Sequence, residues 1–345
     1  METLLISDPT DFSIAAHILQ EGGLVAIPTE TVYGLAGNGL NATAVSNIFI
    51  AKGRPSDNPL ILHISNLEML NPLVKAIPPT AKLLMQAFWP GPLTLIFEAT
   101  DTVPSIVRAG LPSVAIRFPS HPIIQSIISL SGVPLAAPSA NTSGKPSPTN
   151  ACRVQEDLNG KIDAIIDGGS CEFGLESTVV DLTGDVPVIL RPGAITYAML
   201  TDVVAKVIID PALTHHDTSL TPKAPGMKYT HYAPDAEVII VKGPLDRVTS
   251  EINHRLQEAT SKGLRTGVLG TDETLDSLHC DIKISLGSEM NLHQIAANLF
   301  EKLRIFDDLG VDIVYTLSFK EEGIGKAIMN RLEKSAGYHI IDVCE

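Results

Sequence analysis

The first part of the chain alternates short apolar runs with polar connections rich in glycine and proline. Most of the runs are too short for a helix and are bounded by turn residues, so they predict buried strands. In chain order the runs are LVAIP, LILHI, PLTLIFEA, SVAIRFP, PLAAPS, DAIIDGG, STVVDL and PVILRPG. Because few long helical segments separate them, we predict a large, twisted, mixed α/β sheet rather than a regular strand–helix–strand series.

Two segments between these runs carry helix signals. Residues 11–22 have apolar positions at helical spacing and end at a Gly-Gly pair, which is typical of a helix C-terminus. Asn41 is well placed to cap a helix that runs to Gly53.

The pattern is interrupted at residues 207–234, which are polar, aperiodic and contain several prolines, as expected of a linker or lid loop. After it, strand-like runs (VIIVKG, TGVLG, DIKISLG, VDIVYTLSF) alternate with helical segments. This alternation predicts a smaller, Rossmann-like parallel α/β domain. We therefore divide the chain into a first domain (1–206), a linker (207–234) and a C-terminal domain (235–345).

Composition narrows the functional classes. Of the 345 residues, 44% are hydrophobic, which is enough for a sizeable core, and the net charge of −14 argues against tight binding of a long nucleic acid. The four cysteines form no C-x-x-C pair, which argues against a structural zinc site or a disulfide framework. The N-terminus resembles no signal peptide and no window is apolar enough to span a membrane, so we expect a cytoplasmic protein.

Three polar stretches interrupt the ends of apolar runs in the first domain. PTETVYGLAGNG combines the hydroxyl groups of Thr29, Thr31 and Tyr33 with glycines that would let a ligand approach the backbone, although capping threonines in a turn would look the same. In KGRPSDNPLILHI, Lys52 and Arg54 stand at a predicted helix end, where they either bind phosphate or merely complement the helix dipole.

The third stretch, PLAAPSANTSGKPSPTN, places many hydrogen-bond donors on a proline-stiffened loop, which suits an anion as well as plain solvation. Arg117 and Arg191 lie between apolar runs, where an arginine needs an anionic partner. The chain has no Walker, G-x-S-x-G or H-E-x-x-H motif, and it offers no obvious covalent nucleophile or catalytic carboxylate dyad. Chemistry built from Arg, Lys, Ser, Thr and Asn indicates phosphate transfer by positioning and charge neutralisation.

In this order, PTETVYGL, KGRPSDNPL, SVAIRFP, APSANTSGKPSPT, ESTVVDL and ILRPG resemble the YrdC-type threonylcarbamoyl-AMP synthases. APGMKYTHYAP and GIGKAIMNRLEKSAG resemble the long, two-domain version of that family. The resemblance implies a YrdC-type twisted sheet around a central cavity as the catalytic domain. The C-terminal domain would then act as a lid or docking surface.

The resemblance also implies site residues. Lys52 and Arg54 would be catalytic, and ATP would be bound by Lys52, Arg54, Asn58, Ser139, Asn141, Ser147, Arg191 and the linker residue Tyr232. Threonine would be bound by Thr31, Tyr33, His63, Arg117 and Ser177. Substituting Lys52 or Arg54 would then strongly reduce pyrophosphate release and leave folding intact.

The implied reaction joins L-threonine, bicarbonate or CO₂, and ATP into L-threonylcarbamoyladenylate and pyrophosphate. Mg²⁺ would enter with ATP, no metal would be held by protein side chains, and a tRNA threonylcarbamoyl transferase would use the product. Three alternatives stay open: an RNA-binding module, a hydrogenase-maturation carbamoyl transferase, and a sensor of ATP or threonine without turnover. The missing Cys-rich fingers speak against the second and the acidic charge against the first, so tRNA would be met only indirectly or weakly.

Overall fold

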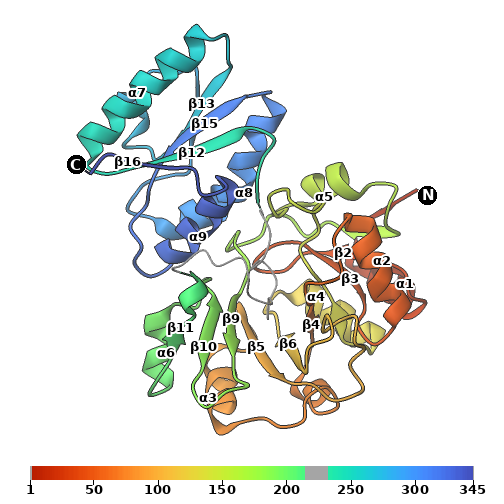
Figure 1. The fold of residues 1–345 in the computed structure, drawn as a ribbon. Coiled ribbons are helices and arrows are strands. Elements are labelled where there is room, and N and C mark those ends of the chain that lie inside the picture. Colours follow the sequence, from red (N-terminus) through yellow and green to blue (C-terminus); the bar gives the residue numbers. More distant parts are fainter. Residues whose placement is uncertain (1, 214–231, 345) are drawn as a thin grey trace. The chain divides into compact units, whose positions relative to one another are not determined.

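The structure is a computed structural model that describes residues 2–213 and 232–344. It divides into two compact units (Figure 1). Unit 1 comprises Met1–Ser143, Ser147–Glu172 and Glu176–Tyr229, and unit 2 comprises Gly144–Pro146, Phe173–Leu175 and Thr230–Glu345. Unit 2 thus takes in two short loop segments from the earlier part of the chain. The predicted linker begins with ordered structure (β11 and a 3₁₀ turn), and its residues 214–231 lie outside the described residues.

Unit 1 is built on a mixed sheet of 11 strands, which confirms the predicted α/β architecture. In spatial order the strands are β1 (Leu4–Ile6), β8 (Ala164–Ile166), β2 (Val25–Ile27), β3 (Gly34–Asn38), β7 (Leu135–Ala136), β4 (Ile61–His63), β6 (Ser113–Arg117), β5 (Leu93–Glu98), β9 (Thr178–Asp181), β10 (Val188–Arg191) and β11 (Ile208–Ile209). Parallel and antiparallel neighbours alternate irregularly, because consecutive strands are joined sometimes by hairpins and sometimes by crossovers.

The helices of unit 1 follow from local signals. They are α1 (Phe12–Gln20), α2 (Ala42–Lys52), α3 (Pro79–Phe88), α4 (Pro122–Ser131), α5 (Ala151–Leu158) and α6 (Tyr197–Val203), with 3₁₀ turns at Pro9–Asp11, Leu67–Leu70 and Pro211–Leu213. As predicted, the Asn41 side chain caps α2 by accepting from the N–H groups of Thr43 and Ala44, and Gly53 ends it with φ at 61°.

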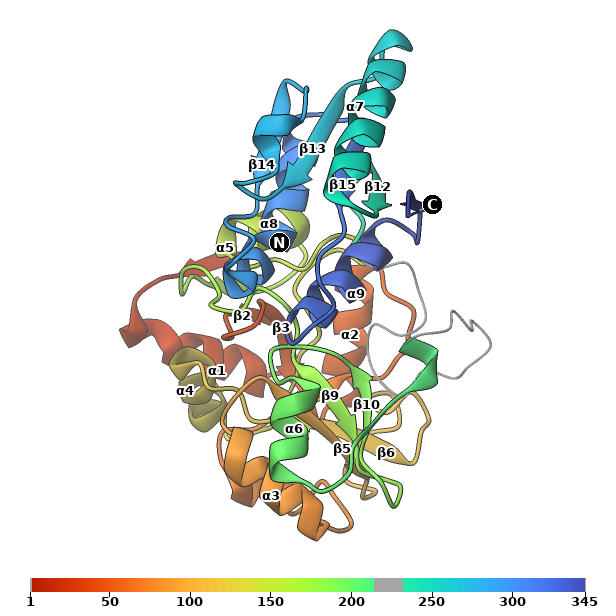
Figure 2. The same ribbon diagram turned by 90° about the vertical axis from the view of Figure 1, so that its left-hand side faces the viewer.

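Apolar clusters bury the sheet on both faces. The pair α1 and α4, seen side by side in Figure 2, covers one face over Val25, Ile27 and Ala36. A larger cluster joins the opposite face to apolar residues of α2, α3 and α5, such as Ile48, Leu84 and Val154. This burial fixes the strands whose ends carry the polar stretches.

The sequence leaves two structures open for the glycines after Tyr33, a loop that a ligand can approach and a hairpin or turn. Residues 34–38 form the interior strand β3, which pairs with β2 in an antiparallel hairpin, so the second alternative holds. A Cβ on Gly39, just after this strand, would collide with the Leu62 side chain, and one on Gly37 would lie 3.1 Å from Leu24. These glycines therefore serve close packing inside the protein, which outweighs their poor strand propensity.

Unit 2 is a five-stranded parallel sheet in the order β14-β13-β15-β12-β16. The strands are β12 (Glu237–Lys242), β13 (Thr266–Gly270), β14 (Ile282–Ser285), β15 (Ile313–Leu317) and β16 (Ile340–Asp342). The helices are α7 (Leu245–Ser261), α8 (Leu292–Asp308) and α9 (Gly325–Ser335), with a 3₁₀ turn at Leu275–Ser277. Helix α7 packs on β12 and β13, and α8 packs with α9, so the predicted parallel α/β domain is confirmed.

Candidate active site

Unit 1 buries many polar and charged side chains. Those less than a tenth exposed include Thr29, Glu30, Thr31, Lys52, Asn58, His63, Thr94, Arg117, Asn141, Ser147, Glu176, Ser177 and Arg191. Burying a charged or hydrogen-bonding group is unfavourable unless partners or a ligand compensate for lost water. The concentration of such groups in one unit marks it as the candidate site.

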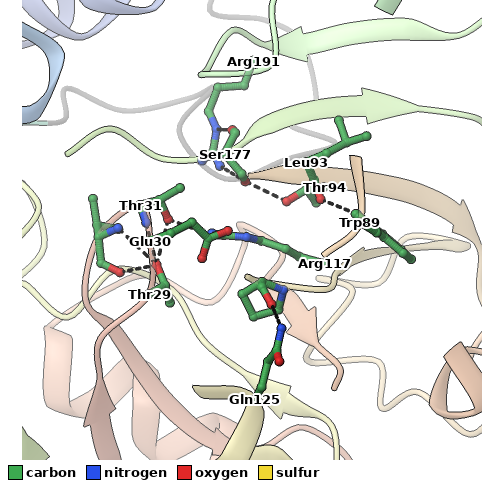
Figure 3. Close-up of polar contacts among 12 residues, drawn as sticks. Thr29, Glu30, Thr31, Trp89, Leu93, Thr94, Arg117, Gln125, Ser177 and Arg191 are labelled. Atoms are coloured by element: carbon green, nitrogen blue, oxygen red, sulfur yellow. Dashed lines mark hydrogen bonds and ion pairs between the residues drawn. The ribbon is translucent and has the colours of Figure 1, made fainter. Parts of the chain in front are cut away.

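Four neighbouring strands carry one polar row of this set. Arg117 on β6 is in register with Thr94 on β5, and Thr94 is in register with Val179 on β9, which in turn faces Arg191 on β10. Ser177, just before β9, joins the row: its Oγ lies 2.7 Å from the Thr94 hydroxyl and accepts from Arg191 Nη2 at 3.1 Å (Figure 3). The sheet itself therefore brings these four side chains together.

The loop after β2 reaches the same row. Arg117 Nη1 donates to Thr31 Oγ1 at 2.8 Å, and Thr29 holds the loop in a tight turn by bonding the backbone of Val32. Four inter-strand steps separate β2 from β6, which would be roughly 19 Å in a flat sheet. The contact therefore requires a strongly curved sheet and a loop that folds back across it.

Arg117 is also paired with Glu30, which the sequence analysis missed. Glu30 Oε1 lies 2.7 Å from Arg117 Nη2, and both side chains are at most 5% exposed. Burial raises the pKa of Glu30, but the charge of Arg117 and hydrogen bonds outweigh it and hold the pKa below its ordinary value. The pair is therefore ionised in the folded protein.

His63 lies beside this pair, in register with Arg117 on the neighbouring strand. Burial, and secondarily the positive charge of Arg117, lowers the pKa of His63 to about 3. Its Nδ1 lies 3.2 Å from the carbonyl oxygen of Ile61. His63 is therefore neutral near pH 7 and brings no charge to the site.

We expect His63 to make the protein less stable in mild acid. Below pH ~6.5 the unfolded chain takes up a proton at His63, whereas the folded protein does so only near pH 3, so acid favours unfolding across this window. Between pH 7 and pH 5 this contributes a loss of about 2 kcal/mol to the free energy of unfolding. Urea unfolding of wild type and His63→Gln at both pH values measures it: equal losses in the two proteins would refute the assignment.

Lys52 is held more tightly than a free phosphate ligand would be. It is 2% exposed, and its Nζ donates to the carbonyl oxygens of Ser139 and Asn141 and approaches Asn141 Oδ1 at 3.4 Å. These contacts bring together the end of α2 and the Ser139–Asn141 segment, two polar stretches that are far apart in the sequence. Lys52 thereby orders the predicted anion-binding loop.

Asn58 gives the clearest sign of a missing ligand in this region. The residue is 1% exposed, yet neither its amide nitrogen nor its amide oxygen has a hydrogen-bond partner in the described chain. Arg54 is half-buried nearby, and its Nη2 makes long contacts to the carbonyl oxygens of Asn58 and Pro59. A buried amide without a partner is unfavourable unless something outside the protein binds it.

The remaining predicted residues are distributed as follows. Ser139 Oγ donates to Asn141 Oδ1, and Ser147 Oγ donates at 2.6 Å to the buried carboxylate of Glu176, a residue that sequence analysis missed. The Tyr33 hydroxyl donates at 2.7 Å to the carbonyl of Gly169, and burial raises the pKa of this phenol well above its ordinary value. It is thus a neutral group that fixes the loop.

Tyr232 belongs to unit 2. Its ring stacks on Phe300 of α8 with 4.9 Å between the ring centroids, and the guanidinium of Arg331 lies 5.8 Å from the ring centroid. The predicted role of Tyr232 in ATP binding stays a prediction.

Unit 2 offers a cavity of about 250 Å³ at the carboxyl ends of β12 and β15, a common place for ligands in parallel sheets. Its buried hydroxyls, Thr271 and Thr274, already hydrogen-bond to each other and to nearby backbone. Most of the other lining side chains are apolar. The buried charged groups of unit 1, with the unpartnered amide of Asn58, make unit 1 the stronger candidate.

The described residues give little support for a metal site, a cysteine nucleophile or a membrane-spanning helix. Within residues 2–213 and 232–344, no group of three or more His, Cys, Asp and Glu is arranged to hold a metal ion. The four cysteines are free, and burial raises the pKa of the Cys171 thiol to about 12, which makes it a poor nucleophile. In the described part of the chain no helix is long and apolar enough to cross a membrane.

Two family models match the chain in succession. One, described as telomere recombination, covers residues 17–193, and the other, described as the C-terminal domain of threonylcarbamoyl-AMP synthase, covers residues 195–337. The threonylcarbamoyl-AMP synthase of Pyrococcus abyssi is 49% identical over 96% of this chain and 95% of its own length. That of Bacillus subtilis is 47% identical over 99% of this chain and 96% of its own length. A crystal structure of P. abyssi Sua5 complexed with L-threonine superposes with a TM-score of 0.94, at 47% identity over 99% of this chain and all of that one.

Proposed function

Because the chain belongs to the threonylcarbamoyl-AMP synthase family, we propose that the buried polar cluster of unit 1 is where it makes L-threonylcarbamoyladenylate. The enzyme is of the nucleotidyltransferase type and takes ATP and L-threonine as substrates. The observation that carries the site assignment is Arg117. Its guanidinium is buried, its Nε has no hydrogen-bond partner in the described chain, and its Nη2 faces the Glu30 carboxylate at 2.7 Å, so the group keeps bonding capacity for a substrate carboxylate.

The threonine half of the site is the group around Arg117. The guanidinium would hold the α-carboxylate, and the hydroxyls of Thr31 and Ser177 would bind the substrate's polar atoms. Two hydrogen bonds support this assignment. Thr31 accepts from Arg117 and Ser177 accepts from Arg191, so both hydroxyl groups are held in fixed positions. The neutral side chain of His63 would line the site, and Tyr33 fixes the loop that carries Thr31.

The nucleotide half is the group around Lys52. Arg54 and Asn58 would contact the phosphates or the nucleoside directly, together with Ser139, Asn141, Ser147 and Arg191. The unpartnered amide of Asn58 supports direct contact with ATP. The bonds of Lys52 to the Ser139–Asn141 segment support a double role, in which Lys52 supplies positive charge and also holds the loop in place.

We propose the following sequence of bonds. The deprotonated threonine nitrogen attacks CO₂, taken up as such or formed from bicarbonate, and loses a proton to water, which gives a carbamate. A carbamate oxygen then attacks the α-phosphorus of ATP, the bond to the bridging β-phosphate oxygen breaks, and pyrophosphate leaves. Since two anions must meet, the barrier is largely electrostatic, and fixed cations with a water-poor site lower it. Mg²⁺ would enter bound to ATP and neutralise part of the triphosphate charge.

Pyrophosphate release tests this function directly. It should require ATP, Mg²⁺, L-threonine and bicarbonate together, and omission of either threonine or bicarbonate should abolish it. Release that continues without threonine and bicarbonate would instead identify a nucleotide hydrolase. A complete lack of release, with ATP or threonine still bound, would favour the sensor interpretation.

A substitution at Asn58 should change ATP binding and protein stability in opposite directions. We expect Asn58→Leu to raise the KM for ATP roughly tenfold and to raise the free energy of unfolding by about 1 kcal/mol, because an unpartnered buried amide is replaced by an apolar group. Asn66→Ala is the matched control. Asn66 is exposed and accepts from the N–H of Met69 at 3.0 Å, so its loss should lower stability by about 1 kcal/mol without changing the KM. A destabilised Asn58→Leu with unchanged KM would contradict the assignment.

The product requires a partner. A mixed carbamic–phosphoric anhydride is labile in water, so we propose that a tRNA threonylcarbamoyl transferase consumes it. The net charge of −14 favours hand-over to that enzyme over tight binding of tRNA by this chain.

A further inference from the structure

No step of the proposed reaction uses Glu30. It extends from the loop after β2 toward Arg117 (Figure 3) and is only 3% exposed. A carboxylate there is unexpected in a site that would bind only anions, because it weakens the field of the arginine. Its placement therefore needs a functional explanation.

The contact between Glu30 and Arg117 leaves hydrogen-bonding capacity unused. Oε1 lies 2.7 Å from Nη2, and the charge of Arg117 with the nearby hydrogen-bonding groups lowers the pKa of Glu30, but within the described chain the geometry of these contacts leaves both carboxylate oxygens, and Nε and Nη2 of Arg117, short of a full hydrogen bond. Buried ion pairs are tolerated when further hydrogen bonds satisfy their remaining lone pairs and protons. Here the buried carboxylate and guanidinium face each other and keep hydrogen-bonding capacity beyond their own contact.

A ligand that completes both groups must carry a carboxylate next to a cationic donor. An α-amino acid has this arrangement, with an α-carboxylate and an α-ammonium on one carbon. The charges agree as well: Arg117 is positive, Glu30 negative and His63 neutral, so a zwitterion enters without leaving a net buried charge. Among the residues predicted to bind threonine, none is anionic, which leaves the ammonium without a partner unless Glu30 supplies it.

We infer that Glu30 binds the α-ammonium group of the amino-acid substrate while Arg117 binds its α-carboxylate. This inference rests on the proposed function and deepens it by explaining how the free amino acid is selected. Thr31 and Arg117 Nη1, already bonded to each other, keep the arginine in place as the substrate joins the pair. Glu30 also has a cost for the reaction, because a carboxylate favours the protonated amine, which is unreactive towards CO₂.

Calorimetric titration of wild type and Glu30→Gln with L-threonine and with 3-hydroxybutanoate, its analogue without the amino group, tests the inference. Wild type should prefer threonine strongly. In Glu30→Gln we expect this preference to fall roughly 10- to 100-fold, the range for loss of one charge-assisted hydrogen bond. Glu30→Asp, which keeps the charge on a shorter chain, should recover part of the preference.

The pH dependence of kcat gives a readout that a purely structural role would not move. If Glu30 holds the ammonium, the amine is harder to deprotonate in the wild-type complex, so the rising limb of kcat against pH should shift to lower pH in Glu30→Gln. If Glu30 only fixed Arg117, its replacement would raise the KM for threonine and leave the rising limb of kcat against pH unchanged.

The outcomes separate this inference from the proposed function. If wild type binds threonine and releases pyrophosphate but Glu30→Gln keeps the full preference over the analogue, the inference fails and the function stands. If wild type binds neither compound, the function itself fails. Should Glu30→Gln not fold, proton counting on wild type decides: threonine binding at pH 8 in two buffers should release almost no protons, and release of about one proton per threonine would overturn the inference.

Discussion

Arg117→Met is expected to raise the KM for L-threonine by at least roughly 30-fold, because truncating one partner of a buried, hydrogen-bonded charge pair costs about 2–5 kcal/mol in binding. The KM for ATP should change little. The same substitution should lower the free energy of unfolding by about 3–5 kcal/mol, since Glu30 is left as an unpaired buried charge. Steady-state pyrophosphate release and urea unfolding measure the two effects.

A double variant and a control variant separate the effect of Arg117 on threonine binding from its effect on stability. Adding Glu30→Gln to Arg117→Met removes the unpaired charge, so stability should return while threonine binding stays lost. Arg108→Met is the matched control: Arg108 is half-buried and donates to the carbonyl oxygens of Val103 and Leu111, so its loss should reduce stability modestly and leave the KM for threonine unchanged. Threonine binding by the stable double variant at wild-type affinity would remove Arg117 from the site.

Lys52→Met is expected to lower kcat/KM for ATP by roughly 100-fold or more, the scale for removing one pre-organised cation or donor from a reacting phosphate. Unlike the expectation from sequence, folding should not stay intact. The substitution leaves the buried carbonyl groups of Ser139 and Asn141 without their donor, at about 1–3 kcal/mol for each unpaired group. The Ser139–Asn141 segment should also loosen, which hydrogen exchange of its amides would detect.

Arg54→Met provides the contrast. Arg54 is half-buried whereas Lys52 is 2% exposed, so removing the Arg54 charge should lower activity with a smaller loss of stability. Lys161→Met is the matched lysine control, because Lys161 is exposed and donates at 2.8 Å to the Asp157 carbonyl. If Lys52→Met lost no more stability than Lys161→Met, the structural half of the Lys52 role would be refuted.

Local signals in the sequence were sufficient for many elements. Helix α2 begins and ends where Asn41 and Gly53 predict, since a cap is satisfied by neighbours in the chain. The strands β4, β5 and β6 lie within the apolar runs that predict them. The order of the motifs along the chain was specific enough to indicate the family, and the similarity to known synthases confirms it.

Strand β3 shows where local signals fail. The sequence of Gly34–Asn38 has weak strand propensity, and it forms a strand because β2 and β7 pair with it on either side. Its glycines are required by side chains such as Leu24 and Ile48, which lie elsewhere in the sequence. Only the tertiary packing decides such a case.

The sequence by itself determined the residue types of the site: cations, hydroxyls and amides at the ends of apolar runs, which indicate phosphate chemistry. Tertiary structure decided which of them act on each other. The pairing of Glu30 with Arg117, the bonds of Lys52 to the Ser139–Asn141 segment and the row from Arg117 to Arg191 all join distant parts of the chain. The reason is physical. The sequence shows only that a carboxylate or a lysine is present, whereas its charge state and role depend on the partners and burial that the folded sheet imposes.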